Sequence, residues 1–341
     1  MRKMAKDGVK VQMCVTSPPY YGLRDYGTAE WVGGDNSCEH EGLVISNNRN
    51  FIDEGGRGSN KKAISSGDCL KCGATRKDSQ IGNEQTPQEF IDNLVEVFAC
   101  VWDILADDGT LWVNLGDSYA NNSSQASNNG RAGFGNQREK VVNRIGNGYK
   151  QKDLMGMPWR LAFALQDFGW YLRQDIIWHK PNPMPESVTD RCTKSHEYIF
   201  LLTKKQKYYF DGKAIQEPAE NAGKVGGSFK GRQGGAEYHA QSGGVGSDAK
   251  EYENRNKRDV WSVPVKPYSG AHFAVYPEEL IEPCILAGSK VGDIVLDPFF
   301  GSGTTGAVAQ KLSRKWVGCE LNKNYEKLQN ERLAQQGLEL A

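Results

Sequence analysis

The segment IVLDPFFGSGTT at residues 294–305 decides the fold of this chain. Its first three residues are apolar and predict a short buried strand that ends at Asp297. Gly301 and Gly303 permit backbone turns that other residues resist, and they let a ligand approach the main chain closely. Thr304 begins a stretch that predicts a helix. A strand, a Gly-rich turn and a helix in this order are typical of an open α/β sheet that binds a ligand at the carboxyl ends of its strands.

Predicted strands and helices alternate along the rest of the chain. Strands are expected at residues 9–15, 110–115, 171–178, 197–202 and 316–320, with a turn at 107–109. Helices are expected after Thr86, which caps a stretch beginning with Pro87, and also at 158–168, 277–287, 304–312 and in the C-terminal tail. This alternation predicts an α/β fold whose mostly parallel sheet is covered by helices on both faces.

The composition of the 341 residues restricts the class of protein. Lysine and arginine together number 42, as do aspartate and glutamate, so the formal net charge is zero. Such a chain has no global attraction for nucleic acid, although a basic face balanced by acid elsewhere can still bind it. No apolar stretch is long enough to span a bilayer, and eight cysteines without a secretory signal indicate a cytoplasmic protein with reduced thiols.

A second motif, Thr16-Ser17-Pro18-Pro19-Tyr20, follows the first predicted strand. The Ser17 hydroxyl and the Pro18 carbonyl are two acceptors held close together, because consecutive prolines stiffen the backbone. Two such acceptors can bind the hydrogens of a planar amine and direct its lone pair toward an electrophile. The Tyr20 ring can stack on the ring that carries the amine. By itself the motif would favour a rigid turn after a strand.

The residues around the Gly-rich turn suit a ligand that contains an amino acid and a ribose. The first amides of the helix at Thr304 attract a carboxylate. Glu320 ends the next predicted strand, where an acid can accept hydrogen bonds from both ribose hydroxyls. No lysine of the Walker type follows the turn, which argues against a nucleoside triphosphate.

Together and in this order, the two motifs resemble those of DNA amino-methyltransferases in the permuted beta arrangement. The resemblance implies a Rossmann-like, doubly wound mixed sheet and S-adenosylmethionine as the cofactor. It implies catalytic roles for Ser17, Pro18, Pro19 and Tyr20. It implies cofactor binding by Asp297, Phe299, Gly301, Ser302, Gly303, Thr304, Thr305 and Glu320. Residues 272–280 resemble a segment that packs on the methionine part of the cofactor, with Phe273 and Pro277 as the candidates.

The same resemblance bears on the reaction. In the family, Ser-Pro-Pro-Tyr mostly accompanies methylation of cytosine N4 and Asp-Pro-Pro-Tyr that of adenine N6, so Ser17 favours cytosine and leaves adenine as the alternative. The base must leave the duplex to reach such a motif, which implies base flipping in double-stranded DNA. Segments 16–27, 109–119, 178–187 and 195–204 further resemble methyltransferases encoded by phages and prophages.

Other classes of function stay open at this point. A catalytically idle DNA-binding protein could have kept the fold, but the intact motif at residues 17–20 argues against it. RNA or a glutamine amide in a protein would also present a planar amine, although Asn-Pro-Pro-Tyr is more usual there. A cognate restriction nuclease is a candidate partner, and the sequence leaves the oligomeric state open.

Two pairs of metal-binding side chains lie in a polar stretch between residues 33 and 80. Cys38 and His40 form the first pair, and Cys69 and Cys72 form a Cys-x-x-Cys-Gly knuckle. Four nitrogen and sulfur ligands suit tetrahedral zinc, and the metal would order a segment too polar to fold by burial alone. We therefore expect a structural zinc site. A redox pair is the alternative, but no thioredoxin-like context surrounds these cysteines.

The resemblance and the composition together divide the chain into four parts. We expect residues 1–32 and 81–204 to form the catalytic half of the core, 33–80 the zinc-binding insertion, 205–265 the target-recognition region and 266–341 the cofactor-binding half. The candidates for DNA contacts are basic residues in Gly-rich loops or near a proline-rich connection, namely Arg131, Arg138, Lys140, Arg191, Lys230 and Arg232. Relatives usually carry a Gly-Asp segment before the first strand, whereas here Asp7 is the sole acid that could contact the cofactor's adenine.

Overall fold

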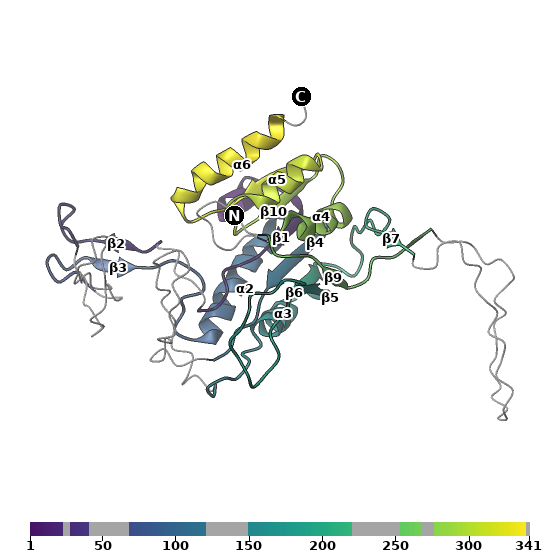
Figure 1. Ribbon diagram of the computed structural model, residues 1–341. Helices are drawn as coiled ribbons and strands as arrows, with labels where there is room; N and C mark the ends of the chain where they lie inside the picture. The colour runs from purple at the N-terminus through teal and green to yellow at the C-terminus, as the bar shows by residue number, and fades with distance from the viewer. Residues whose placement is uncertain (23–27, 41–67, 121–148, 220–252, 267–275, 339–341) are drawn as a thin grey trace, which may run out of the picture.

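The computed structural model describes residues 1–22, 28–40, 68–120, 149–219, 253–266 and 276–338. Its centre is a seven-stranded sheet with the order β11-β10-β1-β4-β6-β5-β9 (Figure 1). These strands are β1 (Val11–Thr16), β4 (Leu105–Leu115), β5 (Tyr171–His179), β6 (His196–Thr203), β9 (Val260–Ser262), β10 (Ile294–Asp297) and β11 (Lys315–Gly318). The predicted doubly wound α/β fold with a mixed sheet is confirmed.

Four neighbouring strands run parallel and create the edge on which the site is built. β1 lies between β10 and β4, with Met13 opposite both Val295 and Thr110, and β10 also pairs with β11. β1 and β10 are mostly buried, as expected of parallel strands that are covered on both faces. Because the strands are parallel, their carboxyl ends meet at one edge. Thr16 and Asp297 therefore come into hydrogen-bond contact although they are 281 residues apart.

The sheet becomes mixed at β6, which runs antiparallel to both β4 and β5. β5 also pairs in parallel with the short edge strand β9. The segment between β5 and β6 contains the proline-rich connection that the sequence predicts. As a result, the first residues of β6 lie at the same edge of the sheet as the last residues of β4, with Tyr198 opposite Leu115.

Residues 107–109 do not form the separate turn that their Asp-Asp-Gly sequence predicts. They belong to β4, whose pairing with β1 shifts register between Val11 and Met13. The strand passes so close to β1 that a Cβ on Gly109 would lie 2.6 Å from the carbonyl oxygen of Gln12. The glycine is therefore required by this close approach of two strands instead of by a turn.

Helices cover both faces of the sheet (Figure 1). α1 (Arg2–Lys6), α2 (Pro87–Ile104) and α3 (Met157–Phe168) pack on one face, and α4 (Glu278–Gly288) and α5 (Thr304–Lys311) pack on the other. α6 (Glu326–Leu338), which follows the short helix η2 (Lys323–Tyr325), packs against α5. Successive residues of a strand enter opposite cores, so that Leu111 and Val113 pack with α2 and α3 while Trp112 packs with α4.

The start of α2 agrees with the sequence prediction. The Thr86 hydroxyl accepts a hydrogen bond from the Glu89 amide at 3.1 Å, and the Glu89 carboxylate accepts one from the Thr86 amide at 3.1 Å. Pro87 occupies the first turn, where its missing amide hydrogen costs nothing. This reciprocal capping fixes the point at which the chain enters the helix after residues 76–85.

Two small antiparallel sheets lie outside the central one. β2 (Glu30–Val32) pairs with β3 (Thr75–Lys77), and β7 (Glu217–Pro218) pairs with β8 (Asn254–Arg255). The pairing of β2 begins at Glu30, three residues before the expected start of the zinc-binding insertion at residue 33. Among the described residues, no helix is both long and apolar enough to cross a membrane.

Candidate active site

Asp297 joins three segments at the carboxyl end of the parallel strands. One of its carboxylate oxygens accepts hydrogen bonds from the Thr16 hydroxyl at 2.6 Å and the Phe299 amide at 3.0 Å. The other accepts from the Thr305 hydroxyl at 2.5 Å and the Tyr276 hydroxyl at 3.1 Å. Only 2% of Asp297 is exposed, and this burial raises its pKa although the four donors oppose the shift. The carboxylate thus connects β1, the Gly-rich turn with α5, and the segment before α4.

The Gly-rich turn is closed by the acid that the sequence assigns to ribose binding. Gly301 and Gly303 have φ angles of +51° and +84°, in the left-handed region that favours glycine. The Gly301 amide donates to the Glu320 carboxylate at 2.8 Å. Glu320 does not end β11 as predicted, because that strand stops at Gly318. The exposed carboxylate instead folds back, also accepting a bond from the Asn322 amide at 2.8 Å, and lies directly beside the turn.

The two phenylalanines of the turn pack against the core of the protein. Phe300 is buried and stacks on Trp316 with ring centroids 5.1 Å apart. A Cβ on Gly318 would lie 2.3 Å from the Phe300 ring. The stack of Phe300 on Trp316 therefore requires glycine at position 318. Phe299 is half-buried and packs against the core on the α2 side. Of the two candidates for the methionine part of the cofactor, Pro277 is buried just before α4, and Phe273 lies outside the described residues.

Three residues that sequence reasoning missed hold the turn in place. Arg332 on α6 donates to the Ser302 hydroxyl at 2.8 Å and to the Thr304 hydroxyl at 2.6 Å. Gln329, one turn earlier, donates to the Gly301 carbonyl at 2.7 Å. Tyr276 hydrogen-bonds to Thr305 as well as Asp297. The sequence contained only a weak indication of these three residues. Gln329 and Arg332 are polar and lie three residues apart, on one face of the predicted tail helix, and Tyr276 precedes the cap of a predicted helix.

The Ser-Pro-Pro-Tyr elbow emerges from β1 next to this turn. Thr16 anchors its start through the bond to Asp297, Pro18 is buried, and Ser17 is half-buried. At the other end, the Tyr20 hydroxyl donates to the Glu197 carboxylate at 2.5 Å and approaches the Asn114 side-chain oxygen at 3.3 Å. The structure therefore brings the predicted catalytic motif and the predicted cofactor turn together at one edge of the sheet.

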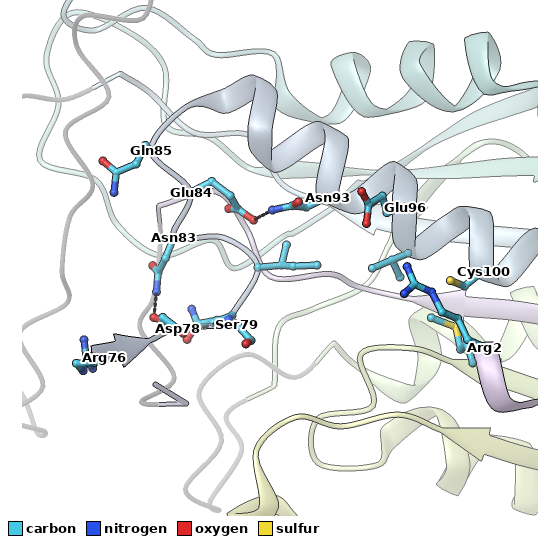
Figure 2. Close-up of a pocket in the computed structure, with 14 residues that line it drawn as sticks. Arg2, Arg76, Asp78, Ser79, Asn83, Glu84, Gln85, Asn93, Glu96 and Cys100 are labelled. Atoms are coloured by element: carbon cyan, nitrogen blue, oxygen red, sulfur yellow. Dashed lines mark hydrogen bonds between the residues drawn. The ribbon is translucent and has the colours of Figure 1, made fainter. Parts of the chain in front are cut away.

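A cleft of about 670 Å³ opens elsewhere, beside α1, α2 and residues 76–85 (Figure 2). Its wall mixes apolar side chains with charged residues of both signs, namely Arg2, Arg76, Asp78, Glu84 and Glu96. Some of these are already paired, because Glu84 accepts a hydrogen bond from Asn93 at 2.9 Å (Figure 2). None of the predicted catalytic or cofactor residues lines this cleft. The candidate active site is thus defined by the strand ends and not by the cleft.

The four predicted metal ligands come together beside the β2–β3 pair. The ligand atoms of Cys38, His40, Cys69 and Cys72 all lie within 4.8 Å of one another. The Cys72 sulfur is 3.3 Å from His40 Nδ1, and the Cys38 and Cys69 sulfurs are 3.9 Å apart. The Gly73 amide donates to the Cys69 carbonyl at 2.8 Å, which closes the knuckle. The predicted clustering of these four side chains is therefore observed.

Comparison with known proteins identifies the family. A family model described as DNA methylase, of the N6/N4 type, matches residues 11–331. The chain belongs to this family of DNA methylases. The methylase is 42% identical over 322 residues to the Type II methyltransferase M.Cfr9I of Citrobacter freundii, covering 92% of the chain and 78% of that relative. It is also 42% identical over 324 residues to M.SmaI of Serratia marcescens, covering 94% and 82% of the two chains.

A solved structure supports the fold of the methylase. The PvuII DNA methyltransferase (cytosine-N4-specific) superposes with a TM-score of 0.53, covering 96% of this chain and 81% of that one. The two sequences are 16% identical, so this similarity concerns the fold alone.

The donor set of the Cys/His cluster in the methylase fits zinc. Loss of hydration raises the pKa of the Cys38 thiol to about 12, and the neighbouring Cys72 and Cys69 thiols reinforce the shift. The Cys38 thiol therefore stays neutral by itself, whereas a bound dication would favour its thiolate form. Three sulfurs and one imidazole are a usual ligand set for structural zinc. A Cβ on Gly34 would lie 2.7 Å from the Cys72 sulfur, so this backbone passes tightly around the cluster.

The candidates for DNA contact are mostly beyond what the structure describes. Arg131, Arg138, Lys140, Lys230 and Arg232 lie outside the described residues. Arg191 is described, and its guanidinium donates to the Glu186 carboxylate at 2.6 Å and lies 4.0 Å from the centre of the Tyr119 ring. A phosphate would have to compete with this ion pair for the arginine.

Proposed function

We propose that the methylase transfers a methyl group from S-adenosylmethionine to the exocyclic N4 of cytosine in double-stranded DNA, at specific sites and after base flipping. The observation that carries this proposal is the buried hydrogen bond between Thr16 and Asp297. It fixes the start of the elbow, which would hold the amine, against the turn, which would hold the methyl donor. Holding the amine and the methyl donor in this way would raise the rate of their reaction, because they no longer have to meet and orient themselves in solution.

The elbow would prepare the amine for attack. The lone pair of an exocyclic amine is delocalised into the base, so the amine is a poor nucleophile. It becomes a better one when its two hydrogens are held so that the lone pair is no longer conjugated with the ring. Ser17 Oγ and the Pro18 carbonyl oxygen would accept those two hydrogens, while the Tyr20 ring would stack on the flipped base. The bound cofactor would supply an electrophilic methyl group on a sulfonium. A strong base is not required, because the proton can leave after the methyl group has been transferred.

The turn and its neighbours would bind the cofactor. The amides that begin α5, at Thr304 and Thr305, suit the cofactor's carboxylate. Glu320 beside Gly301 suits the ribose hydroxyls, since its exposed carboxylate retains acceptor capacity beyond its two amide bonds. Phe299 and Pro277 would supply apolar contacts. Asp297, Ser302 and Gly303 would shape the turn from within.

The choice of cytosine rests on Ser17 and on the resemblance to enzymes with a Ser-Pro-Pro-Tyr elbow. The order of the motifs, with the elbow first and the turn last, supports assignment to the permuted beta arrangement. Adenine N6 is the second candidate, because the same two acceptors can hold either amine. The division of the chain into a catalytic half, a zinc-binding insertion, a target-recognition region and a cofactor-binding half forms part of this proposal. The phage or prophage type, the cytoplasmic location and a cognate restriction nuclease stay predictions.

Nucleoside mass spectrometry tests the reaction. Unmethylated genomic DNA of mixed sequence is incubated with the methylase and S-adenosylmethionine, digested and analysed for modified nucleosides. We expect N4-methylcytosine, with none formed when the cofactor is omitted. N6-methyladenine would keep the mechanism but contradict the assignment of the base. If the protein binds the cofactor yet modifies no DNA, the proposed substrate is wrong and RNA or a protein amide becomes the candidate.

We also propose that Cys38, His40, Cys69 and Cys72 bind one structural zinc ion. The metal would stabilise the β2–β3 region, which has little apolar surface to bury. All four positions around the ion would be filled by protein side chains, so the site would leave no place for a substrate.

Metal analysis checks this assignment. Elemental analysis of the purified protein should give about one zinc per chain, as expected for a single four-ligand site. Cys72→Ser should lower the zinc content sharply, because a hydroxyl is a much poorer ligand than a thiolate. Cys192→Ser is the matched control, since Cys192 is exposed and outside the cluster. Equal zinc contents in the two variants would contradict the proposed ligand set.

A further inference from the structure

The hydroxyl of Tyr20, in the elbow after β1, lies in a polar cluster with residues of β4 and β6. Glu197 at the start of β6 accepts its hydrogen bond at 2.5 Å, and Asn114 near the end of β4 contacts both, at 3.3 Å in each case. Asn114 is itself fixed, because its amide donates to the Tyr198 carbonyl at 3.1 Å. The antiparallel pairing of β4 with β6 puts these residues at the same edge of the sheet as the elbow.

Lys180 holds the other side of the Glu197 carboxylate. Its ammonium donates to the second carboxylate oxygen and lies 4.3 Å from the centre of the Trp178 ring. The side chains of Lys180 and Glu197 are only 19% and 13% exposed. Burying such a pair costs hydration energy, and an apolar pair of similar size is often at least as stable. The pair therefore calls for an explanation other than stability.

The space around the Tyr20 ring is equally restricted. A Cβ on Gly116 would lie 2.6 Å from the Tyr20 ring and 3.2 Å from the Glu197 carboxyl carbon. Gly82 passes on another side, where an added Cβ would lie 3.1 Å from the Tyr20 carbonyl oxygen. Gly82 thus limits the backbone of Tyr20, while the close approach of Gly116 and the anchored hydroxyl leave the ring few alternative positions.

We infer that Glu197, oriented by Lys180, is a positioning residue that fixes the ring of Tyr20 for stacking on the flipped base. The inference rests on the proposed function and deepens it. The carboxylate lies at the hydroxyl end of the tyrosine, so it acts on the base only through the angle and position of the ring. An aromatic ring free to tilt would hold the amine less accurately in front of the methyl donor.

Two variants test the inference by methyl transfer to DNA. Tyr20→Phe removes only the hydroxyl, and we expect a fall in kcat of about tenfold with an unchanged affinity for S-adenosylmethionine. The second variant, Lys180→Met with Glu197→Leu, removes both charges together and leaves no unpaired buried ion. It should lower kcat by a similar factor while its melting temperature stays close to that of the wild type. Combining all three substitutions should cause no further loss, because each interrupts the same linkage.

The outcomes are distinct. A wild-type kcat in Tyr20→Phe, or losses that multiply in the combined variant, would overturn the positioning role. Asp107→Asn is the control, since this acid also pairs with lysine but lies near the beginning of β4, away from the elbow. It should transfer methyl groups as the wild type does. Absence of transfer by the wild type itself would instead overturn the proposed function, and this inference with it.

Discussion

Ser17→Ala should lower the rate of methyl transfer by roughly 10²-fold or more, the usual cost of losing one hydrogen-bonding group that acts on the reacting atoms. The substitution leaves only the Pro18 carbonyl to hold the amine, so the lone pair stays partly conjugated with the base. The affinity for S-adenosylmethionine should not change, because Ser17 belongs to the elbow and not to the Gly-rich turn. Single-turnover rates and calorimetric titration with the cofactor measure the two quantities separately.

The side chain of Ser17 is small and half-buried, so its loss should leave the fold intact. Ser37→Ala provides a matched control, since Ser37 lies beside the metal cluster, away from the elbow, and its hydroxyl donates to the Asp35 carboxylate at 2.7 Å. Unchanged turnover in Ser17→Ala would remove this hydroxyl from the mechanism. A joint loss of turnover and cofactor affinity would place Ser17 in the cofactor site instead.

Asp297→Ala should abolish measurable cofactor binding and lower the free energy of unfolding by on the order of 3 kcal/mol. The carboxylate accepts bonds from Thr16, Phe299, Thr305 and Tyr276, and all four donors would lose this acceptor in a buried place. Without it, the turn is no longer tied to β1 or to the segment before α4. Chemical denaturation and titration with S-adenosylmethionine measure the two effects.

Asp297→Asn separates the two parts of this prediction. The amide keeps the shape and one acceptor oxygen, but its NH₂ group would face donors, so an intermediate loss of stability is expected. Asp293→Ala is the control at the opposite end of the same strand region, where the carboxylate accepts a hydrogen bond from the Lys290 amide at 2.7 Å. Cofactor binding by Asp297→Ala at the wild-type level would contradict the assigned role of the carboxylate.

Local patterns in the sequence were sufficient for the elements of the core. The apolar run before Asp297 and the glycines after it gave the strand, the turn and the start of α5, because these depend on neighbouring residues. The capping box at Thr86 likewise fixed the start of α2. The prediction for residues 107–109 was wrong, because Gly109 is required by a neighbouring strand that no local pattern reveals.

Only some residues of the candidate site could be predicted from the sequence. Ser17, Asp297 and the cysteine pairs belong to compact motifs, whose residue types and spacing already indicate a chemistry. For Arg332, Tyr276 and Glu197 the sequence gives no indication of the contact that each makes, since the partner lies far away in the chain, such as Ser302 for Arg332 and Tyr20 for Glu197.

The sequence by itself determined which chemical groups are present: two acceptors on a stiff elbow, a Gly-rich turn before a helix, and four metal-binding side chains. Only the tertiary structure decided that the elbow and the turn share one edge, because this follows from the parallel pairing of β1 with β10 across 281 residues of chain. The tertiary structure also decided which hydrogen bonds support the site, namely those from α6 to the turn and those from β4 and β6 to Tyr20. They depend on which strands become neighbours, and strand order is set by packing of the whole chain.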